Sequence, residues 1–145
     1  MPKFRTFLWF DDNAEEAARF YVSIFKNSQI VNAGPMVVSF LLDGQAFMAL
    51  NGGPHFALTP AVSIYVDCEG QAEVDDLWAK LLQGGSESQC GWLVDKFGLS
   101  WQIIPKQLGE LMGDDDDEKS ARVLQAMLKM VKIDVAALQR AYNGP

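Results

Sequence analysis

The chain has 145 residues, a length at which a single domain can bury a hydrophobic core. Hydrophobic residues make up 49% of the chain and charged residues 21%, which is typical of globular proteins. The net charge of −7 argues against nucleic-acid and anionic-membrane partners, because both require a basic surface.

The first 54 residues follow a strand, helix and three-strand pattern. Lys3–Phe10 is rich in aromatic and apolar residues, which predicts a buried strand. Asp12 followed by Glu15 predicts a helix that begins in the manner of a capping box, with Asp12 as its N-cap. The apolar stripe of this helix consists of Ala17, Phe20, Tyr21, Ile24 and Phe25. Three strands should follow, with an Asp43-Gly44 hairpin turn between the last two: Gln29–Val31, Val37–Leu42 and Gln45–Asn51.

The same pattern recurs after a linker at residues 55–60. A strand is predicted at Val62–Val66, and a helix at Gln71–Leu82 that ends before Gly84-Gly85. Two further strands should close this second pattern, at about Cys90–Asp95 and at Leu99–Ile104, before Pro105.

Residues 106–145 are predicted to form a helical tail. The acidic run Asp114–Glu118 favours a helix start, because the positive end of the helix dipole attracts carboxylates. Met127, Met130 and Tyr142 supply apolar side chains that can cover either a neighbouring subunit or the tail's own domain.

The two patterns are internal copies of each other. Leu8–Asp11 (LWFD) corresponds to Ile64–Asp67 (IYVD), and Phe20-Tyr21 corresponds to Leu77-Trp78. The sequence therefore predicts an α+β fold of two βαβββ modules, whose twisted strands form one curved half-barrel sheet. We expect a single domain over residues 1–145, with modules at 1–54 and 61–105 and the tail at 106–145.

Several features predict a cytoplasmic protein. The two cysteines, Cys68 and Cys90, are expected to stay reduced because the core is large enough without a disulfide. The N-terminal residues lack the order of charged, apolar and small residues that a signal peptide requires. No apolar run approaches the ~20 residues that cross a bilayer, so no membrane partner is expected.

Four segments of the chain resemble the PhnB-like branch of the vicinal oxygen chelate superfamily, the group of glyoxalases, bleomycin-resistance proteins and extradiol dioxygenases. They are Ala17-x-x-Phe20-Tyr21-x-x-Ile24-Phe25, Asn51-Gly52-Gly53-Pro54, Ser63-x-x-Val66-x-Cys68, and the run from Cys90 to Pro105. The resemblance covers the chain to about Leu111, and it implies a small-molecule cleft and a homodimer. This branch is often labelled as a demethylubiquinone methyltransferase domain. We do not expect that activity, because the chain lacks a glycine-rich strand-to-helix turn for a nucleotide-like methyl donor.

The resemblance also implies a divalent metal held by His, Glu or Gln side chains from the first and last strands of each copy. The corresponding positions are Arg5, Ala49 (or Asn51 in a register shifted by two), Ala61 and Gln102. An arginine repels a cation, alanines have no lone pair to donate, and one amide oxygen is a weak ligand. We therefore predict no metal and no other cofactor.

Alternation along the strands identifies candidate ligand-binding residues on the cleft side. Arg5 either grips an anionic ligand or pairs with an internal acid. Phe7, Trp9, Phe47 and Tyr65 form either an aromatic slot or the packed interior of the barrel. Ser100 and Gln102 either orient a ligand or satisfy neighbouring backbone groups. The full set of candidates is Arg5, Phe7, Trp9, Phe47, Asn51, Ser63, Tyr65, Ser100 and Gln102.

Three other features are weaker as sites. His55 is the chain's only histidine and lies in the linker without a nearby carboxylate, which favours a surface or packing role over general-base chemistry. The cysteines are predicted to act as small hydrophobic residues. The Asp114–Asp117 run lacks the ligand spacing of a calcium loop, which favours a solvated helix cap.

The sequence thus predicts a metal-independent protein that binds a small molecule, anionic or aromatic, and does not identify any catalytic residue. The alternative is an enzyme of the glyoxalase or dioxygenase type with a divergent metal site or an anion-stabilising site, in which Arg5 and Gln102 act together.

Overall fold

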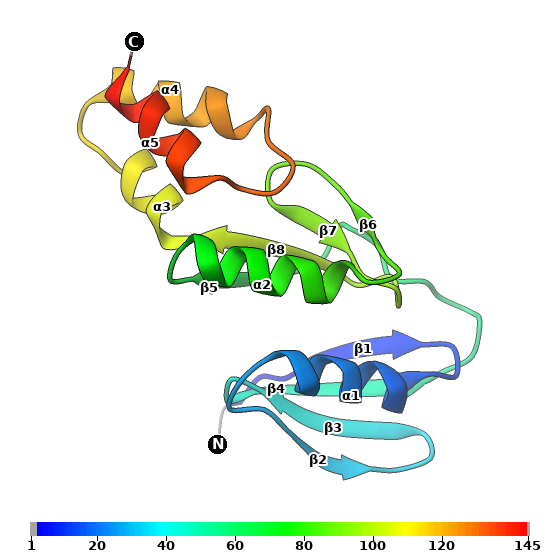
Figure 1. Ribbon diagram of the computed structural model, residues 1–145. Coiled ribbons are helices and arrows are strands. Elements are labelled where there is room, and N and C mark those ends of the chain that lie inside the picture. The colour runs from blue at the N-terminus through cyan, green and yellow to red at the C-terminus, as the bar shows by residue number, and fades with distance from the viewer. Residues whose placement is uncertain (1–2, 145) are drawn as a thin grey trace. The chain divides into compact units, whose positions relative to one another are not determined.

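The computed structural model describes residues 3–144, and the chain divides into two compact units, Met1–Thr59 and Pro60–Pro145. Each unit contains one βαβββ module with a four-stranded sheet, and the second unit also contains three C-terminal helices (Figure 1). The predicted α+β class with two modules and a helical tail is confirmed. Pairing of the modules into one half-barrel sheet stays a prediction. Among the described residues, no helix is long and apolar enough to cross a membrane.

The first unit has a sheet of order β1-β4-β3-β2, in which β1 is parallel to β4 and the other pairs are antiparallel. The elements are β1 (Thr6–Phe10), α1 (Ala14–Ile24), β2 (Gln29–Ala33), β3 (Val37–Leu42) and β4 (Gln45–Asn51). The β3–β4 hairpin turns at Asp43-Gly44 as predicted, and both residues have positive φ angles, which a tight hairpin turn requires.

Burial alternates along the strands and separates the two faces of the first sheet. One face packs on α1, where the Tyr21 ring lies 6.4 Å from that of Phe40, and Phe40 stacks on Phe47 at 5.4 Å. The buried residues of this face are Leu8, Phe10, Val38, Phe40, Leu42, Phe47 and Ala49. We call the face opposite the module helix the far face; here it carries Phe7, Trp9, Val37, Ser39, Met48 and Leu50.

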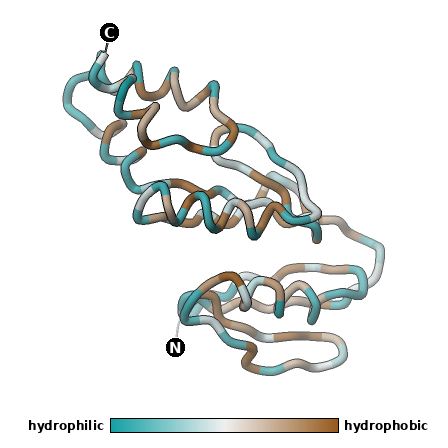
Figure 2. Tube along the Cα trace, viewed as in Figure 1, coloured by the Kyte–Doolittle hydropathy of each residue, from teal (hydrophilic) through white to brown (hydrophobic). Residues whose placement is uncertain are grey.

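The second unit repeats this arrangement with a sheet of order β5-β8-β7-β6, and β5 is parallel to β8. The elements are β5 (Ser63–Cys68), α2 (Gln71–Leu82), β6 (Ser86–Glu87), β7 (Trp92–Val94) and β8 (Ser100–Pro105). Hydrophobic and hydrophilic residues alternate around α2 (Figure 2), which buries Val74, Leu77, Trp78 and Leu81. The two-residue strand β6 was not predicted, because it is too short for an alternating pattern.

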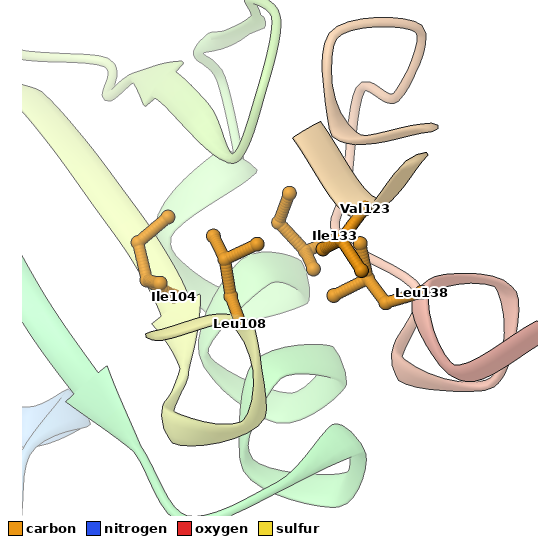
Figure 3. Close-up of a cluster of buried hydrophobic side chains, with 5 residues drawn as sticks. All are labelled: Ile104, Leu108, Val123, Ile133 and Leu138. Carbon is orange, nitrogen blue, oxygen red and sulfur yellow. The ribbon is translucent and has the colours of Figure 1, made fainter. Parts of the chain in front are cut away.

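The tail forms a small helical core of its own. Its helices are α3 (Lys106–Met112), α4 (Asp117–Met127) and α5 (Val135–Asn143). One buried side chain from each helix (Leu108, Val123 and Leu138), together with Ile133 from the segment before α5, meets Ile104 at the end of β8 (Figure 3). Met127, Met130 and Tyr142 pack against this cluster, so within the described chain they cover the tail's own unit.

Asp95 fixes the turn that joins β7 to β8. Its side chain is 3% exposed and accepts hydrogen bonds from the backbone N–H groups of Phe97 (2.8 Å) and Leu99 (3.1 Å) through Oδ1. The indole N–H of Trp101 donates to Oδ2 at 2.9 Å. One buried carboxylate therefore sets both the turn and the first residues of β8.

We expect Asp95→Asn to lower the free energy of unfolding by about 2–3 kcal/mol, because an amide nitrogen then faces a donor in a buried site. The measurement is urea denaturation followed by circular dichroism. Asp12→Asn, at an exposed position, is the matched control and should change stability little. Equal stability of the two variants would contradict the role of Asp95.

A hydrogen bond ties the end of α5 to the loop before α4. The Tyr142 hydroxyl donates to Asp114 Oδ2 at 2.6 Å. This bond holds the pKa of the Asp114 carboxyl below its ordinary value and raises the pKa of Tyr142. The interaction therefore favours the ionised carboxylate and the neutral phenol.

We expect Tyr142→Phe to melt at a lower temperature than the parent between pH 5 and pH 9. A carboxyl whose pKa is lowered by folding stabilises the fold above its unfolded pKa of about 3.8, and this contribution is lost as the pH falls further. The raised pKa of Tyr142 means that the contribution is also lost at high pH, once the phenol ionises. Melting curves of both proteins across pH test this prediction. A difference in melting temperature between parent and variant that persists unchanged at pH 2 would contradict it.

Candidate functional site

The far face of the second sheet carries a row of three side chains across three strands. Tyr65 on β5 pairs with Gln102 on β8, which pairs in turn with Trp92 on β7. Residues paired across a ladder project from the same face and lie side by side. We call Tyr65, Gln102 and Trp92 the amide row: a carboxamide flanked by two aromatic rings.

The amide of Gln102 is held in place by a neighbouring strand. Its Nε2 donates to the Ser63 hydroxyl at 3.0 Å. Within residues 3–144 the carboxamide oxygen of Gln102 and the hydroxyl hydrogen of Ser63 make no further hydrogen bond, so the pair offers a ligand one acceptor and one donor. Ser100 lies beside Ser63 in the ladder; it is 1% exposed, and its Oγ has no hydrogen-bond partner among the described residues.

Tyr65 is the exposed member of the row, with 54% of its surface accessible. Partial burial, together with the charge of nearby Asp67, raises the pKa of its hydroxyl. The phenol is therefore neutral at physiological pH and can donate a hydrogen bond.

Trp92 was missed as a candidate by the sequence interpretation. Counting alternation along a three-residue strand gives no firm face, and the signal lies instead in the hairpin. Once Asp95 fixes the β7–β8 turn, the antiparallel register places Trp92 opposite Gln102.

On the first sheet, Phe7 and Trp9 both project from the far face as predicted. Phe7 is 53% exposed. Trp9 is half-buried: its indole N–H donates to the Gly53 carbonyl at 2.9 Å, and its ring meets Phe56 edge-to-face at 4.9 Å. Arg5 lies just before β1 and is exposed, without an ion pair among the described residues.

The prediction that Phe47 shares this face is wrong. Phe47 is 6% exposed and stacks on Phe40 beneath α1, on the opposite side of the sheet from Phe7 and Trp9. In the β1–β4 ladder Trp9 pairs with Leu50, and a displacement of one residue in β4 moves every side chain to the other face.

Asn51 has a structural role that the sequence interpretation did not foresee. Its Oδ1 accepts from the backbone N–H of Ala14 at 2.8 Å, and its Nδ2 donates to the Pro35 carbonyl at 3.1 Å. The N-cap residue of α1 is Asn13 rather than the predicted Asp12, and Asn13 makes no side-chain cap bond. The end of β4 thus supplies the cap of α1.

The glycines that follow Asn51 complete this junction. The N–H of Gly52 donates to the Phe10 carbonyl at 2.8 Å, and that of Gly53 to Asp11 at 3.0 Å. A Cβ on Gly52 would collide with the indole ring of Trp9. Gly53 has a φ of +88°, a conformation that suits glycine. The Asn51–Pro54 segment therefore joins β1, β4 and α1.

The ladders also correct the mapping of the metal positions. Tyr65 corresponds to Trp9 in the repeat, so the partner of Trp9, Leu50, is the counterpart of Gln102, in place of Ala49. The four positions are then Arg5, Leu50, Ala61 and Gln102. One amide oxygen among four positions does not fit a divalent ion. Among residues 3–144, no group of three His, Cys, Asp or Glu side chains is placed to hold a metal.

The remaining polar candidates have local structural roles or are exposed. Burial raises the pKa of the Cys68 thiol to about 12, which makes it a poor nucleophile. Cys90 is a half-buried free thiol, and His55 is exposed. Asp116 caps α4 by accepting from the backbone N–H groups of Glu118 and Lys119.

Known proteins share the modules of this chain. A family model described as 3-demethylubiquinone-9 3-methyltransferase matches residues 2–104. A solved structure of a PhnB protein from Bacillus cereus is 38% identical, with a TM-score of 0.66, over 72% of this chain and 99% of that one. No curated protein matches the chain.

Two more distant structures share the fold. A glyoxalase-related enzyme from Fulvimarina pelagi is 14% identical, with a TM-score of 0.52, over 72% of this chain and 88% of its own. The fosfomycin resistance protein FosX from Listeria monocytogenes, solved with Mn(II) and sulfate, is 14% identical, with a TM-score of 0.53, over 70% and 87%.

We expect Asn51→Ala to lower the free energy of unfolding by about 1–2 kcal/mol, because the first turn of α1 loses its cap. Asn32→Ala, at an exposed position on β2, is the control and should be nearly neutral. Chemical denaturation measures both variants. If Asn51→Ala is as stable as the control, the capping role is refuted.

Proposed function

The chain belongs to the 3-demethylubiquinone-9 3-methyltransferase family of PhnB-like proteins, in the vicinal oxygen chelate superfamily, and from this premise we propose that it binds a small planar molecule without a metal ion. The observation that carries the proposal is the amide row. Gln102, braced by Ser63, presents a hydrogen-bonding amide between the rings of Tyr65 and Trp92. Small-molecule sites typically combine aromatic surface with a few fixed polar groups.

The chemistry of the amide row favours an aromatic ligand with a neutral polar group. Gln102 and Ser63 supply one acceptor and one donor, and neither carries a charge. A carboxamide or phenol matches both. An anionic ligand requires a cation, which the amide row does not supply. Arg5, just before β1 in the first unit, is the separate candidate for binding an anion.

Binding without a metal is supported by the residues at the four positions that correspond to the superfamily's metal ligands. Of the four positions where the superfamily holds its ion, three carry arginine, leucine and alanine here, and only Gln102 offers an oxygen. The alternative is an enzyme of the glyoxalase or dioxygenase type, which either holds a metal with unorthodox ligands or uses Arg5 and Gln102 to stabilise an anionic intermediate.

We do not extend the methyltransferase name of the family to an activity of this chain. Methyl donors of the nucleotide type bind at glycine-rich turns between a strand and a helix. In the described chain the strand-to-helix junctions are Asp11-Asp12-Asn13, Glu69-Gly70 and the direct step from Pro105 to Lys106, which do not fit that requirement.

We also propose that the protein acts as a homodimer in the cytoplasm. Exposed apolar side chains are available for an interface: Val31 and Met36 in the first unit, and Leu128 and Val131 in the second. Both cysteines are free, in keeping with a reducing compartment. Sedimentation analysis tests the oligomeric state, and a monomer at high protein concentration would refute it.

Ligand-observed NMR titrations with benzamide and benzoate test the binding proposal. We expect the parent protein to bind benzamide, and Gln102→Ala to weaken this binding about tenfold, because one buried hydrogen bond is lost. Gln29→Ala, an exposed glutamine on β2, is the matched control and should bind like the parent. Arg5→Ala should weaken binding of benzoate only.

Two outcomes would contradict the proposal in different ways. If the parent binds neither probe, the small-molecule site fails. If EDTA abolishes binding and Mn²⁺ restores it, the site requires a metal and the enzymatic alternative is favoured.

A further inference from the structure

The far face of the second sheet ends against the C-terminal tail. Ile104 lies two residues beyond Gln102 on β8, so its side chain projects from the same face. It is nevertheless 4% exposed, because it packs with Leu108 and Ile133 of the tail (Figure 3). On β8 the face is therefore closed one side-chain row beyond the amide row, whereas Asp67, the partner of Ile104 on β5, stays exposed.

The tail approaches this end of the face at the level of the backbone. The N–H groups of Cys90 and Gly91 donate to the carbonyls of Met130 and Val131, both at 2.8 Å. A Cβ on Gly91 would lie 2.7 Å from Ile104 Cδ1 and 3.0 Å from Ile133 Cγ1. At Gly91, therefore, Ile104 and Ile133 leave no room for even a methyl group.

A second set of contacts fixes Ile133. The side-chain amide of Gln71, at the start of α2, donates to the Ile133 carbonyl at 3.0 Å and accepts from the Val135 N–H at 2.7 Å. Lys132 pairs with Asp75 of α2 at 2.7 Å. The residues on both sides of Ile133 are thus attached to α2, and its position is set by the module itself.

We propose that the tail is the end wall of the binding site, and that Ile104 and Ile133 determine its specificity by restricting it to single-ring amides and phenols. The inference rests on the proposed function. Successive rows on one face of a strand are about 7 Å apart, close to the length of one substituted ring. A ligand whose polar group reaches both Ser63 and Gln102 places its ring over the amide row, with the far edge toward Ile104.

The wall belongs to this chain rather than to the shared modules. The family match ends at residue 104, and the tail follows it. The Bacillus cereus protein is covered over 99% of its length by 72% of this chain, so it has no counterpart for the rest. Ligands that fit the modules alone are therefore expected to be rejected here when they carry a group on the far edge of the ring.

The test compares the affinities of benzamide and 4-ethylbenzamide, measured by ligand-observed NMR on the full chain. The parent should prefer benzamide about tenfold or more, since a filled pocket rejects an added two-carbon group. Ile133→Ala should reduce this preference about tenfold by opening the wall. Ile133→Val should reduce the preference for benzamide by a smaller factor. This variant provides the test if Ile133→Ala does not fold.

Leu138→Ala is the matched control. Leu138 is as fully buried as Ile133 and belongs to the same cluster, but it lies on the side away from Ile104 (Figure 3). The Leu138→Ala variant should keep the parent's preference for benzamide, although its free energy of unfolding falls about as much as that of Ile133→Ala.

The outcomes distinguish a failure of the end-wall proposal from a failure of the proposed function. Equal affinities of the parent for the two probes, or an unchanged preference in both Ile133 variants, would overturn the wall and leave the proposed function standing. A parent protein that binds neither probe would overturn the proposed function, and the wall's role in specificity with it.

Discussion

Each module is organised by the parallel ladder that joins its first strand to its last. A parallel pair requires a crossover, which here consists of the module helix and the strands that follow it. The helix covers one face of the ladder, and the proposed binding site lies on the other face. In the second module this ladder sets Tyr65 beside Gln102, and the hairpin continues the same row to Trp92. The candidate site is thus a direct product of strand register.

The segments by which the chain resembles its family mainly stabilise the fold. Asn51 caps α1 from the end of β4, and Gly52 leaves room for the ring of Trp9. Asp95 binds the turn before β8 and the indole of Trp101. These segments identify the family without identifying a reaction. Of the side chains proposed to face a ligand, Tyr65 lies between the residues that carry the resemblance, whereas Gln102 is part of the Cys90–Pro105 run.

Most of the fold was predictable from the sequence, because its signals are local. The Asp43-Gly44 hairpin and the helix Gln71–Leu82 lie where turn chemistry and periodicity place them. The face of Phe47 was not predictable, because it depends on how β4 aligns with β1, and these strands are far apart in sequence. The start of α1 was misplaced for a related reason: its cap comes from Asn51. Ser63, Tyr65, Ser100 and Gln102 were expected on one face, and the β5–β8 ladder places them side by side.

The contacts between the tail and residues 90–91 also have a consequence for biosynthesis. The ribosome synthesises the chain from its N-terminus. The four strands and one helix of the first module are therefore available before the second module can be completed. Until residues 130–133 have emerged, the N–H groups of Cys90 and Gly91 lack their acceptors, and Ile104 lacks its cover. A nascent chain that pauses before residue 130 exposes both the apolar side chain of Ile104 and the unpaired N–H groups of Cys90 and Gly91. Other chains or chaperones can bind these groups. The emergence of residues 130–133 therefore decides when this edge of the second module is covered.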